Sequence, residues 1–179
     1  MRLAVIADTH VPVRARDLPA AAWAIIDGAD AVLHAGDIVE PALLDRLRER
    51  APVWAVLGNN DRAFGDTLPE RLELELGGVP LAMVHDSGEA RDRRARLRRW
   101  FPAARVVVFG HSHIPVVEDD GDLLLLNPGS PTDRRRMPSF TLAILTLEPG
   151  RPRAEIVELP SPTPGARMPA PGTRGSRAR

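Results

Sequence analysis

Short apolar runs without polar alternation begin this chain and recur along it. They cover residues 3–7, 31–35, 53–57 and 105–109. Runs of this length suit strands that are buried on both faces of a sheet. Helices are predicted between the first three runs, over residues 17–27 and 41–50, with Asp17 as a cap and Pro41 in a first turn. Alternating strands and helices predict a parallel sheet.

A different pattern begins at residue 71. Residues 71–76 alternate strictly between polar and apolar side chains, and two glycines separate them from an apolar run over 79–85. This pattern predicts a β-hairpin whose first strand has one exposed face, preceded by a loop over 62–69. A basic helix is predicted over residues 89–100. The remaining apolar runs predict consecutive antiparallel strands over residues 115–118, 122–126, 139–147 and 153–159.

Length and composition narrow the class of protein. The chain has 179 residues, enough for one domain with a full core, which we predict over residues 1–159. The stretch 160–179 is dominated by Pro, Gly, Ser, Thr, Ala and Arg and is predicted to be a disordered tail. No signal peptide or membrane span is evident, so we expect a cytoplasmic protein without a membrane partner. The absence of Cys excludes disulfides, thiolate metal sites and a cysteine nucleophile.

The charge pattern gives little reason to expect a nucleic-acid-binding protein. The formal net charge is zero, and without the last twenty residues the chain has 24 acidic residues against 20 Arg, a net charge of −4. Nucleic acid is therefore expected at most as a substrate. We interpret the basic helix over 89–100 as a solvated outer helix rather than as a phosphate or nucleic-acid patch.

Polar motifs follow five of the predicted strands, where open α/β sheets form their binding crevices. They read Asp8-Thr9-His10, His34-Ala35-Gly36-Asp37, Gly58-Asn59-Asn60-Asp61, His85-Asp86 and Gly110-His111-Ser112-His113. In an extended segment side chains two residues apart point the same way, so Asp8 with His10, and His111 with His113, are each expected to face one place. His34 lies inside an apolar run, and we expect it to be a hydrogen-bonded structural residue.

Mixed nitrogen and oxygen ligands from these motifs favour a transition metal over Mg²⁺ or Ca²⁺. Two divalent ions held by two carboxylates leave an excess of positive charge, which suits a phosphate ester. Ions about 3.5 to 4 Å apart can lower the pKa of a shared water and stabilise an in-line displacement. The sequence therefore predicts a two-metal site for hydrolysis of a phosphate ester.

All five motifs, in this order, resemble the calcineurin-like metallophosphoesterase superfamily. Asn127-Pro128-Gly129-Ser130, after the last histidine pair, is similar to the YfcE-like branch of small phosphodiesterases. The resemblance implies an α/β fold, a four-layer αββα sandwich of two mixed β-sheets flanked by helices. It implies two divalent transition-metal ions, Mn first, with Ni, Co, Fe, Zn or Mg as alternatives. One ion would be held by Asp8, His10, Asp37 and His113, and the other by Asp37, Asn59, His85 and His111.

Two positions depart from the family pattern. Asn60 stands where many relatives have a His that protonates the leaving group, and an amide cannot act as an acid. Asp86 stands where relatives usually have Gly, and we expect it to orient His85 or, less readily, to replace the missing acid. In relatives an Arg after the Asn-Pro-Gly-Ser block lies near the metals, so Arg134, Arg135 or Arg136 is a candidate for binding phosphate. An exposed turn is the alternative interpretation.

These observations predict a metal-dependent phosphodiesterase acting on a small phosphodiester, or less readily on a phosphomonoester. One alternative is a protein-binding scaffold on the same fold with little or no catalysis, as in some eukaryotic members that resemble this branch. A second is a nucleic-acid-binding module that uses the Arg-rich helix and tail. The substrate, the metal and any assembly into a homo-oligomer stay open at this stage.

Overall fold

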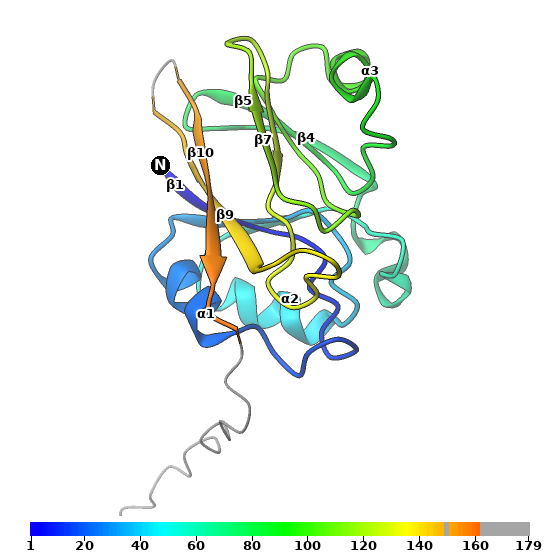
Figure 1. The fold of residues 1–179 in the computed structure, drawn as a ribbon, viewed down its shortest axis with the longest axis vertical. Helices are drawn as coiled ribbons and strands as arrows, with labels where there is room; N and C mark the ends of the chain where they lie inside the picture. The colour runs from blue at the N-terminus through cyan, green and yellow to red at the C-terminus, as the bar shows by residue number, and fades with distance from the viewer. Residues whose placement is uncertain (149–150, 162–179) are drawn as a thin grey trace, which may run out of the picture.

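Two five-stranded sheets pack face to face in the computed structural model, which describes residues 1–148 and 151–161 (Figure 1). The first sheet consists of β1 (Arg2–Ile6), β2 (Ala31–His34), β3 (Val53–Ala55), β9 (Phe140–Thr146) and β10 (Arg153–Leu159). Its order is β10-β9-β1-β2-β3, with β1, β2 and β3 parallel and β9 antiparallel to its neighbours. Of the predicted tail over 160–179, residues 162–179 lie outside the described residues.

The second sheet consists of β4 (Arg71–Leu76), β5 (Val79–Val84), β6 (Val106–Val108), β7 (Val116–Asp119) and β8 (Leu124–Asn127). Its order is β4-β5-β6-β8-β7. The predicted hairpin is present as β4 and β5, and β5, β6 and β8 run parallel. Both sheets are thus mixed.

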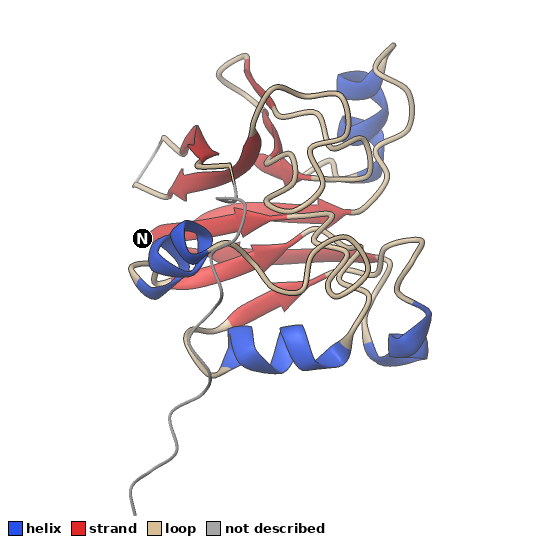
Figure 2. Cartoon of the chain, turned by 60° about the horizontal axis from the view of Figure 1, so that its bottom comes forward, coloured by secondary structure: helices blue, strands red, loops and turns tan. Residues whose placement is uncertain are grey.

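Helices cover the outer faces of the two sheets. They are α1 (Ala20–Asp27) and α2 (Pro41–Arg48) on the first sheet, α3 (Arg93–Trp100) on the second, and a 3-10 segment, η1 (Arg62–Thr67), where a loop was predicted. Figure 1 shows α1 and α2 on one side of the molecule and α3 on the other, and Figure 2 shows the strands between them. The predicted αββα sandwich is confirmed.

Three apolar clusters hold these layers together. Alternate residues of β1 and β4, such as Leu3, Val5 and Leu76, meet between the sheets. Leu43, Leu44 and Leu47 of α2 are buried against the outer face of the first sheet, and each such side chain contributes roughly 1.5 to 3 kcal/mol. A third cluster lies under α3. Among the described helices none is long and apolar enough to cross a membrane.

Two predictions of local structure were wrong. Helix α1 has Pro19 at its N-cap position and no side-chain cap, and the carboxylate of Asp17 instead accepts hydrogen bonds from the Arg46 guanidinium at 2.8 and 2.9 Å. The late strands also do not form one antiparallel series. Strands β7 and β8 pair, as do β9 and β10, but the chain crosses from one sheet to the other between β8 and β9.

The arginines of α3 tie this helix to the loops around it. Guanidinium groups of Arg94, Arg96 and Arg98 donate to main-chain carbonyls, including those of Leu123 at 2.7 Å and Ala104 at 2.9 Å. Arg94 also pairs with Asp120 at 2.8 Å. The helix is an outer helix, as predicted, and much of its charge serves local packing.

Candidate metal centre

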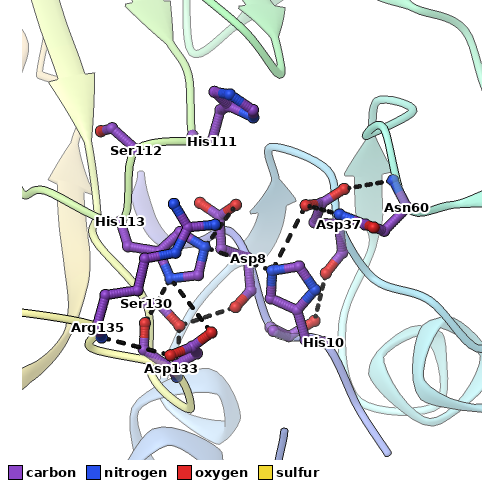
Figure 3. A network of polar contacts seen from close by, with 12 residues as sticks. Asp8, His10, Asp37, Asn60, His111, Ser112, His113, Ser130, Asp133 and Arg135 are labelled. Carbon is purple, nitrogen blue, oxygen red and sulfur yellow. Dashed lines mark hydrogen bonds and ion pairs between the residues drawn. The ribbon is translucent and has the colours of Figure 1, made fainter. Parts of the chain in front are cut away.

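The predicted motifs come together where parallel strands of both sheets end. Asp8 and His10 follow β1, Asp37 follows β2 and Asn59 follows β3. From the second sheet, His85 follows β5, and the pair His111 and His113 follows β6. Because the sheets pack face to face, their loops meet at one edge of the sandwich, and the candidate ligands gather there. Figure 3 shows Asp8, His10, Asp37, His111 and His113 of this group.

Five of these ligand candidates share an uncommon backbone conformation. Positive φ angles of 44 to 66° occur at Asp8, His10, Asp37, His111 and His113. Such left-handed conformations cost about 1 to 2 kcal/mol for residues with a Cβ and cluster at functional sites. The prediction that the pair Asp8 and His10, and the pair His111 and His113, lie in extended segments was therefore wrong. The side chains reach a common place because the chain turns sharply at each of them.

Two pairs of histidines stand on either side of two carboxylates. The rings of His10 and His113 stack with centroids 5.3 Å apart, and those of His85 and His111 meet edge to face at 5.2 Å. Asp37 Oδ2 lies 3.4 Å from His10 Nε2 and 3.6 Å from His85 Nε2. This oxygen thus lies within reach of both pairs.

Asp8 is the second carboxylate in this group. One set of ligand atoms close enough to share a cation comes from Asp8, His10 and His113, and another from Asp8, Asp37 and His85. Figure 3 shows Asp8 in the middle, with His113 on one side and Asp37 on the other. Each set offers buried oxygen and nitrogen atoms, the mixture that transition metals bind.

Hydrogen bonds to carbonyl oxygens fix two of the imidazole rings. His85 Nδ1 donates to the carbonyl of Ala35 at 2.7 Å, and His113 Nδ1 donates to the carbonyl of Asp133. A carbonyl can only accept, so Nδ1 carries the proton and Nε2 of the neutral ring keeps its lone pair. This is how proteins usually prepare histidine to bind a metal. In both rings Nε2 points toward the carboxylates.

The carboxylate of Asp8 tests whether these residues suit a metal ion. Both of its oxygens are buried without a hydrogen-bond partner in the described residues, and His113 Nε2 lies 3.4 Å from Oδ1. Burial, helped by the charge of Asp37, raises the pKa of Asp8 to about 8. Burial also lowers the pKa of His113 to about 4, so the ring is neutral. A buried carboxylate that faces imidazole lone pairs fits a bound cation, since a cation would satisfy both.

Asn59 joins the second histidine pair. Its side-chain oxygen lies 3.0 Å from His85 Nε2 and 3.0 Å from His111 Nδ1. In the tautomer that donates only from Nδ1, to the carbonyl of Ala35, His85 Nε2 carries a lone pair, and two electron-rich atoms then face each other here. A cation held between these atoms would remove that repulsion. Asn59 is exposed and His111 half-buried, so this side of the centre opens to solvent.

Sequence comparison identifies the family. Residues 1–150 match the calcineurin-like phosphoesterase superfamily domain. The chain belongs to this superfamily. It is 34% identical over 164 residues to a probable metallophosphoesterase of Methanothermobacter thermautotrophicus, covering 90% of this chain and 95% of that one. It is 38% identical over 135 residues to a probable metallophosphoesterase of Methanocaldococcus jannaschii, covering 74% of this chain and 69% of the relative.

Solved structures with the same fold cover most of this chain. A Thermotoga maritima protein is 31% identical, with a TM-score of 0.69 over 88% of this chain and 99% of that one. Zinc-bound Vps29 from Entamoeba histolytica is 24% identical, with a TM-score of 0.71 over 88% and 99%. An archaeal phosphodiesterase is 21% identical, with a TM-score of 0.66 over 88% and 100%. The last two likenesses concern the fold alone.

Asn60, the first departure from the family pattern, binds the carboxylate of Asp37. Its side-chain nitrogen donates to Asp37 Oδ2 at 2.7 Å, and its backbone nitrogen donates to Oδ1 at 2.8 Å. Burial would raise the pKa of Asp37, but the electrostatic effect of the nearby His85 and these two hydrogen bonds outweigh it and lower the pKa. Asn60 thus helps to keep the carboxylate of Asp37 ionised and in place.

Asp86, the second departure, does not orient His85 as expected. One of its oxygens accepts a hydrogen bond from the backbone of Gly88 at 2.7 Å, and the side chain is exposed. The carbonyl of Ala35 orients the His85 ring instead. His34 is fully buried and shares a 3.0 Å hydrogen bond with Thr9, which agrees with the structural role predicted for it.

Sequence reasoning missed the role of Asp61 in holding the metal-site loops. Its buried carboxylate accepts three backbone hydrogen bonds, from Asp37 at 2.9 Å, Val39 at 2.7 Å and Gly58 at 2.7 Å. These bonds tie the loop after β2 to the loop after β3. The signal was present, because Asp61 ends the Gly58-Asn59-Asn60-Asp61 motif, but the motif suggested ligands rather than scaffolding.

The Asn-Pro-Gly-Ser block plays a similar part beneath two other loops. Ser130 Oγ donates to the carbonyl of Asp8 at 2.8 Å, and Thr132 Oγ1 donates to the carbonyl of Thr9. Asn127 Nδ2 donates to the carbonyl of Gly110 at 2.9 Å. The block therefore fixes the loops that carry the first ligand pair and the last.

Arg134 and Arg135 differ in direction. Arg134 donates to the carbonyl of Met137, and its guanidinium lies 5.9 Å from the middle of the Phe140 ring. It is thus engaged away from the candidate metal centre. Arg135 runs beside His113 toward Asp8 (Figure 3), and its charge contributes to lowering the pKa of His113. Only Arg135 of these two faces the candidate metal centre.

A cavity of about 600 Å³ adjoins the second histidine pair. Its walls include Asn59, His85 and His111 from the centre, and Asp86 at the rim. A ligand that reaches the candidate metals can therefore extend into this space.

Proposed function

We propose that this protein is a phosphodiesterase that works with two divalent metal ions. The observation that supports it is the position of Asp8 and Asp37 between two pairs of histidines. Both carboxylates are buried, and the oxygens of Asp8 have no hydrogen-bond partner in the described residues. Buried carboxylates without partners are unfavourable, and bound cations would compensate their charge.

Each ion has its own set of proposed ligands, with Asp37 common to both. The first set is Asp8, His10, Asp37 and His113, and the second is Asp37, Asn59, His85 and His111. Mn is the metal we expect first, and Ni, Co, Fe, Zn and Mg are the alternatives. When bound, two such ions supply positive charge to the phosphate and lower the pKa of a water molecule that can attack phosphorus.

Other residues of the chain prepare this centre. The carbonyls of Ala35 and Asp133 keep His85 and His113 in the tautomer with a free Nε2. Asn60 holds the carboxylate of Asp37. Arg135 is proposed to donate hydrogen bonds to a phosphate oxygen from the side of His113, because charge-assisted bonds of this kind are the strong ones.

The choice of a diester follows from the proton that the leaving group needs. A general acid typically accelerates such reactions by about 10² to 10⁴-fold, and Asn60 has no acidic proton to give. Asp86 lies on the cavity wall beside His85 and is the remaining candidate to deliver one. We therefore expect esters with stable leaving groups to react best, and diesters better than monoesters.

Two rival functions predict different behaviour. A scaffold on this fold would bind metal without turnover, a role that the fold likeness to Vps29 leaves open. A nucleic-acid-binding module would use the Arg-rich helix, but Arg94, Arg96 and Arg98 are engaged with carbonyls of the chain itself. Its binding would fall steeply with salt and survive chelation. A cytoplasmic location and a homo-oligomer also stay predictions.

The experiment that tests the proposal is hydrolysis of bis(4-nitrophenyl) phosphate and 4-nitrophenyl phosphate by chelator-treated protein. Mn, Ni, Co, Fe, Zn and Mg are added back one at a time, and bound metal is counted by elemental analysis. We expect metal-dependent turnover with the diester favoured. Asp37→Ala should lose both bound metal and turnover, whereas Asp45→Ala, at an exposed position on α2, should keep both. Protein that binds two ions and hydrolyses neither ester would support the scaffold instead.

A further inference from the structure

The cavity beside the second histidine pair is placed to receive part of a substrate. Its volume of about 600 Å³ lies in the range of small-molecule sites. Asn59, His85 and His111 form one wall. An organic group attached to a phosphate at the candidate metal centre therefore has this cavity next to it.

The outer wall of the cavity is a preformed loop. It covers residues 62–70, which leave the centre at Asp61 and return to it where the carbonyl of Pro69 accepts a hydrogen bond from Leu57 at 2.8 Å. Phe64 and Leu68 anchor its inner side because both are buried in the cluster under the first sheet. The loop can thus present its other side chains without first becoming ordered.

Five charged side chains surround the cavity without pairing with one another. They are Arg62, Asp66, Glu70, Arg71 and Asp86, and a sixth charged lining residue, Asp61, is buried with its carboxylate bound to backbone groups. All five are exposed, and none of them takes part in an ion pair within the described part of the chain. Apart from the Asp86 oxygen that accepts from the backbone of Gly88, their donors and acceptors are therefore available to a ligand.

The balance of charge indicates the kind of ligand. With Asp61 included, four carboxylates against two guanidinium groups leave a net charge of −2 around the cavity, which opposes a second anionic group on the substrate. Carboxylates accept strong hydrogen bonds from hydroxyl groups. Arg71 is held with its guanidinium 4.2 Å from the centre of the Trp100 ring and can donate from a fixed position. Leu57 and Val84 add an apolar strip for the face of a ring.

We infer that this cavity binds a neutral, hydroxyl-bearing organic group of a phosphodiester, of the type that a ribonucleoside carries. The alternation of carboxylate acceptors from Asp66 and Glu70 with guanidinium donors from Arg62 and Arg71 suits the vicinal hydroxyls of a ribose. This inference rests on the proposed phosphodiesterase function and names its substrate class. It makes Asp66 and Glu70 residues that determine specificity.

The test compares two esters that differ in two hydroxyl groups. Uridine 5′-(4-nitrophenyl) phosphate and its 2′,3′-dideoxy analogue share the same base and the same chromogenic leaving group. We expect the metal-loaded protein to hydrolyse the uridine ester with a kcat/KM at least about tenfold higher, as a site that hydrogen-bonds a hydroxyl disfavours the analogue that lacks it. In Asp66→Asn and Glu70→Gln this ratio should fall several-fold. Glu73→Gln, an exposed residue of β4 outside the cavity, should leave it unchanged.

A binding measurement separates this inference from the proposed function. Free uridine and 2′,3′-dideoxyuridine are titrated into the full-length protein while backbone amides are followed by NMR. Saturable shifts at Leu57 and Gly65 that are stronger with uridine support the cavity assignment even if neither ester is hydrolysed. Equal kcat/KM values for the two esters, or a ratio that the two variants do not change, would overturn it while leaving the phosphodiesterase proposal intact.

Discussion

The side chain of Asn60 donates a 2.7 Å hydrogen bond to Asp37 Oδ2, the oxygen that also lies within 3.4 and 3.6 Å of His10 and His85. Where the family pattern has a histidine for proton transfer, this chain therefore has a residue that positions a carboxylate. In this chain the residue at position 60 contacts Asp37, the proposed bridging ligand, whereas a histidine there would contact the leaving group.

Asn60→Ala should weaken metal binding about tenfold, because removing a partner that orients a ligand typically costs 10- to 100-fold in metal affinity. Competition between the protein and a fluorescent chelator for Mn measures this directly. The backbone bond from residue 60 to Asp37 Oδ1 persists in the variant, so the site should still assemble. A variant with unchanged affinity and slower turnover would instead assign Asn60 to the substrate.

Arg135→Gln should raise the KM for a phosphodiester, because its guanidinium is the one directed toward Asp8 and His113. A change of about tenfold corresponds to one charge-assisted hydrogen bond in an exposed setting. Arg134→Gln is the matched control, since that side chain donates to the carbonyl of Met137 and should leave the KM unchanged. Equal effects of the two substitutions would mean that general positive charge, and not a directed contact, accounts for them.

The sequence predicted the part of this protein that depends on short-range pattern. Unbroken apolar runs located the central strands, and the residues just after them, from Asp8 to His113, located the candidate centre because parallel strands end at one edge. The crossing between β8 and β9 was not predictable in the same way. Both strands satisfy an antiparallel pattern, and only packing between the sheets decides their partners.

Backbone conformation and scaffolding were also beyond the sequence pattern. Asp and His adopt the left-handed conformation more often than most residues with a Cβ, but still only in a minority of cases, so the motifs did not indicate the turn at Asp8 or His113. Asp61 and Ser130 hold the loops through backbone groups, and a backbone partner leaves no trace in the identity of the residue that provides it. Which arginine faces the centre likewise depended on the path of the loop after Ser130.

Gly58→Ala should destabilise the fold by about 2 kcal/mol or more, as overpacking of a buried site does, and should reduce metal binding. A methyl group at this position would overlap the backbone nitrogen and side chain of Asp37, and the backbone there cannot yield because Asp61 binds both loops. Urea denaturation measures the loss. Gly28→Ala is the control, since Gly28 has a φ of −96° and its added methyl group meets nothing closer than 3.7 Å. A Gly58 variant as stable as the parent would contradict the close approach of these loops.

The buried carboxylate of Asp8 should make the metal-free protein less stable as the pH rises above neutrality. Burial and the charge of Asp37 raise its pKa to about 8, compared with about 3.9 in an unfolded chain. The folded state therefore keeps a proton that the unfolded state releases. The stabilisation that protonated Asp8 contributes is complete below about pH 4 and is lost as the pH rises through 8. The free energy of unfolding should decrease by about 1 kcal/mol between pH 7 and pH 8.

Two buried histidines act in the opposite direction but in another pH range. Burial lowers the pKa of His34 to about 3 and that of His113 to about 4, so their contribution is present above about pH 6.5 and is lost in acid. Urea denaturation with a chelator at pH 7, 8 and 9 therefore isolates Asp8. Asp8→Asn should abolish the decrease across this range, and His34→Gln should leave it in place. A decrease that persists in Asp8→Asn would place the titrating group elsewhere in the protein.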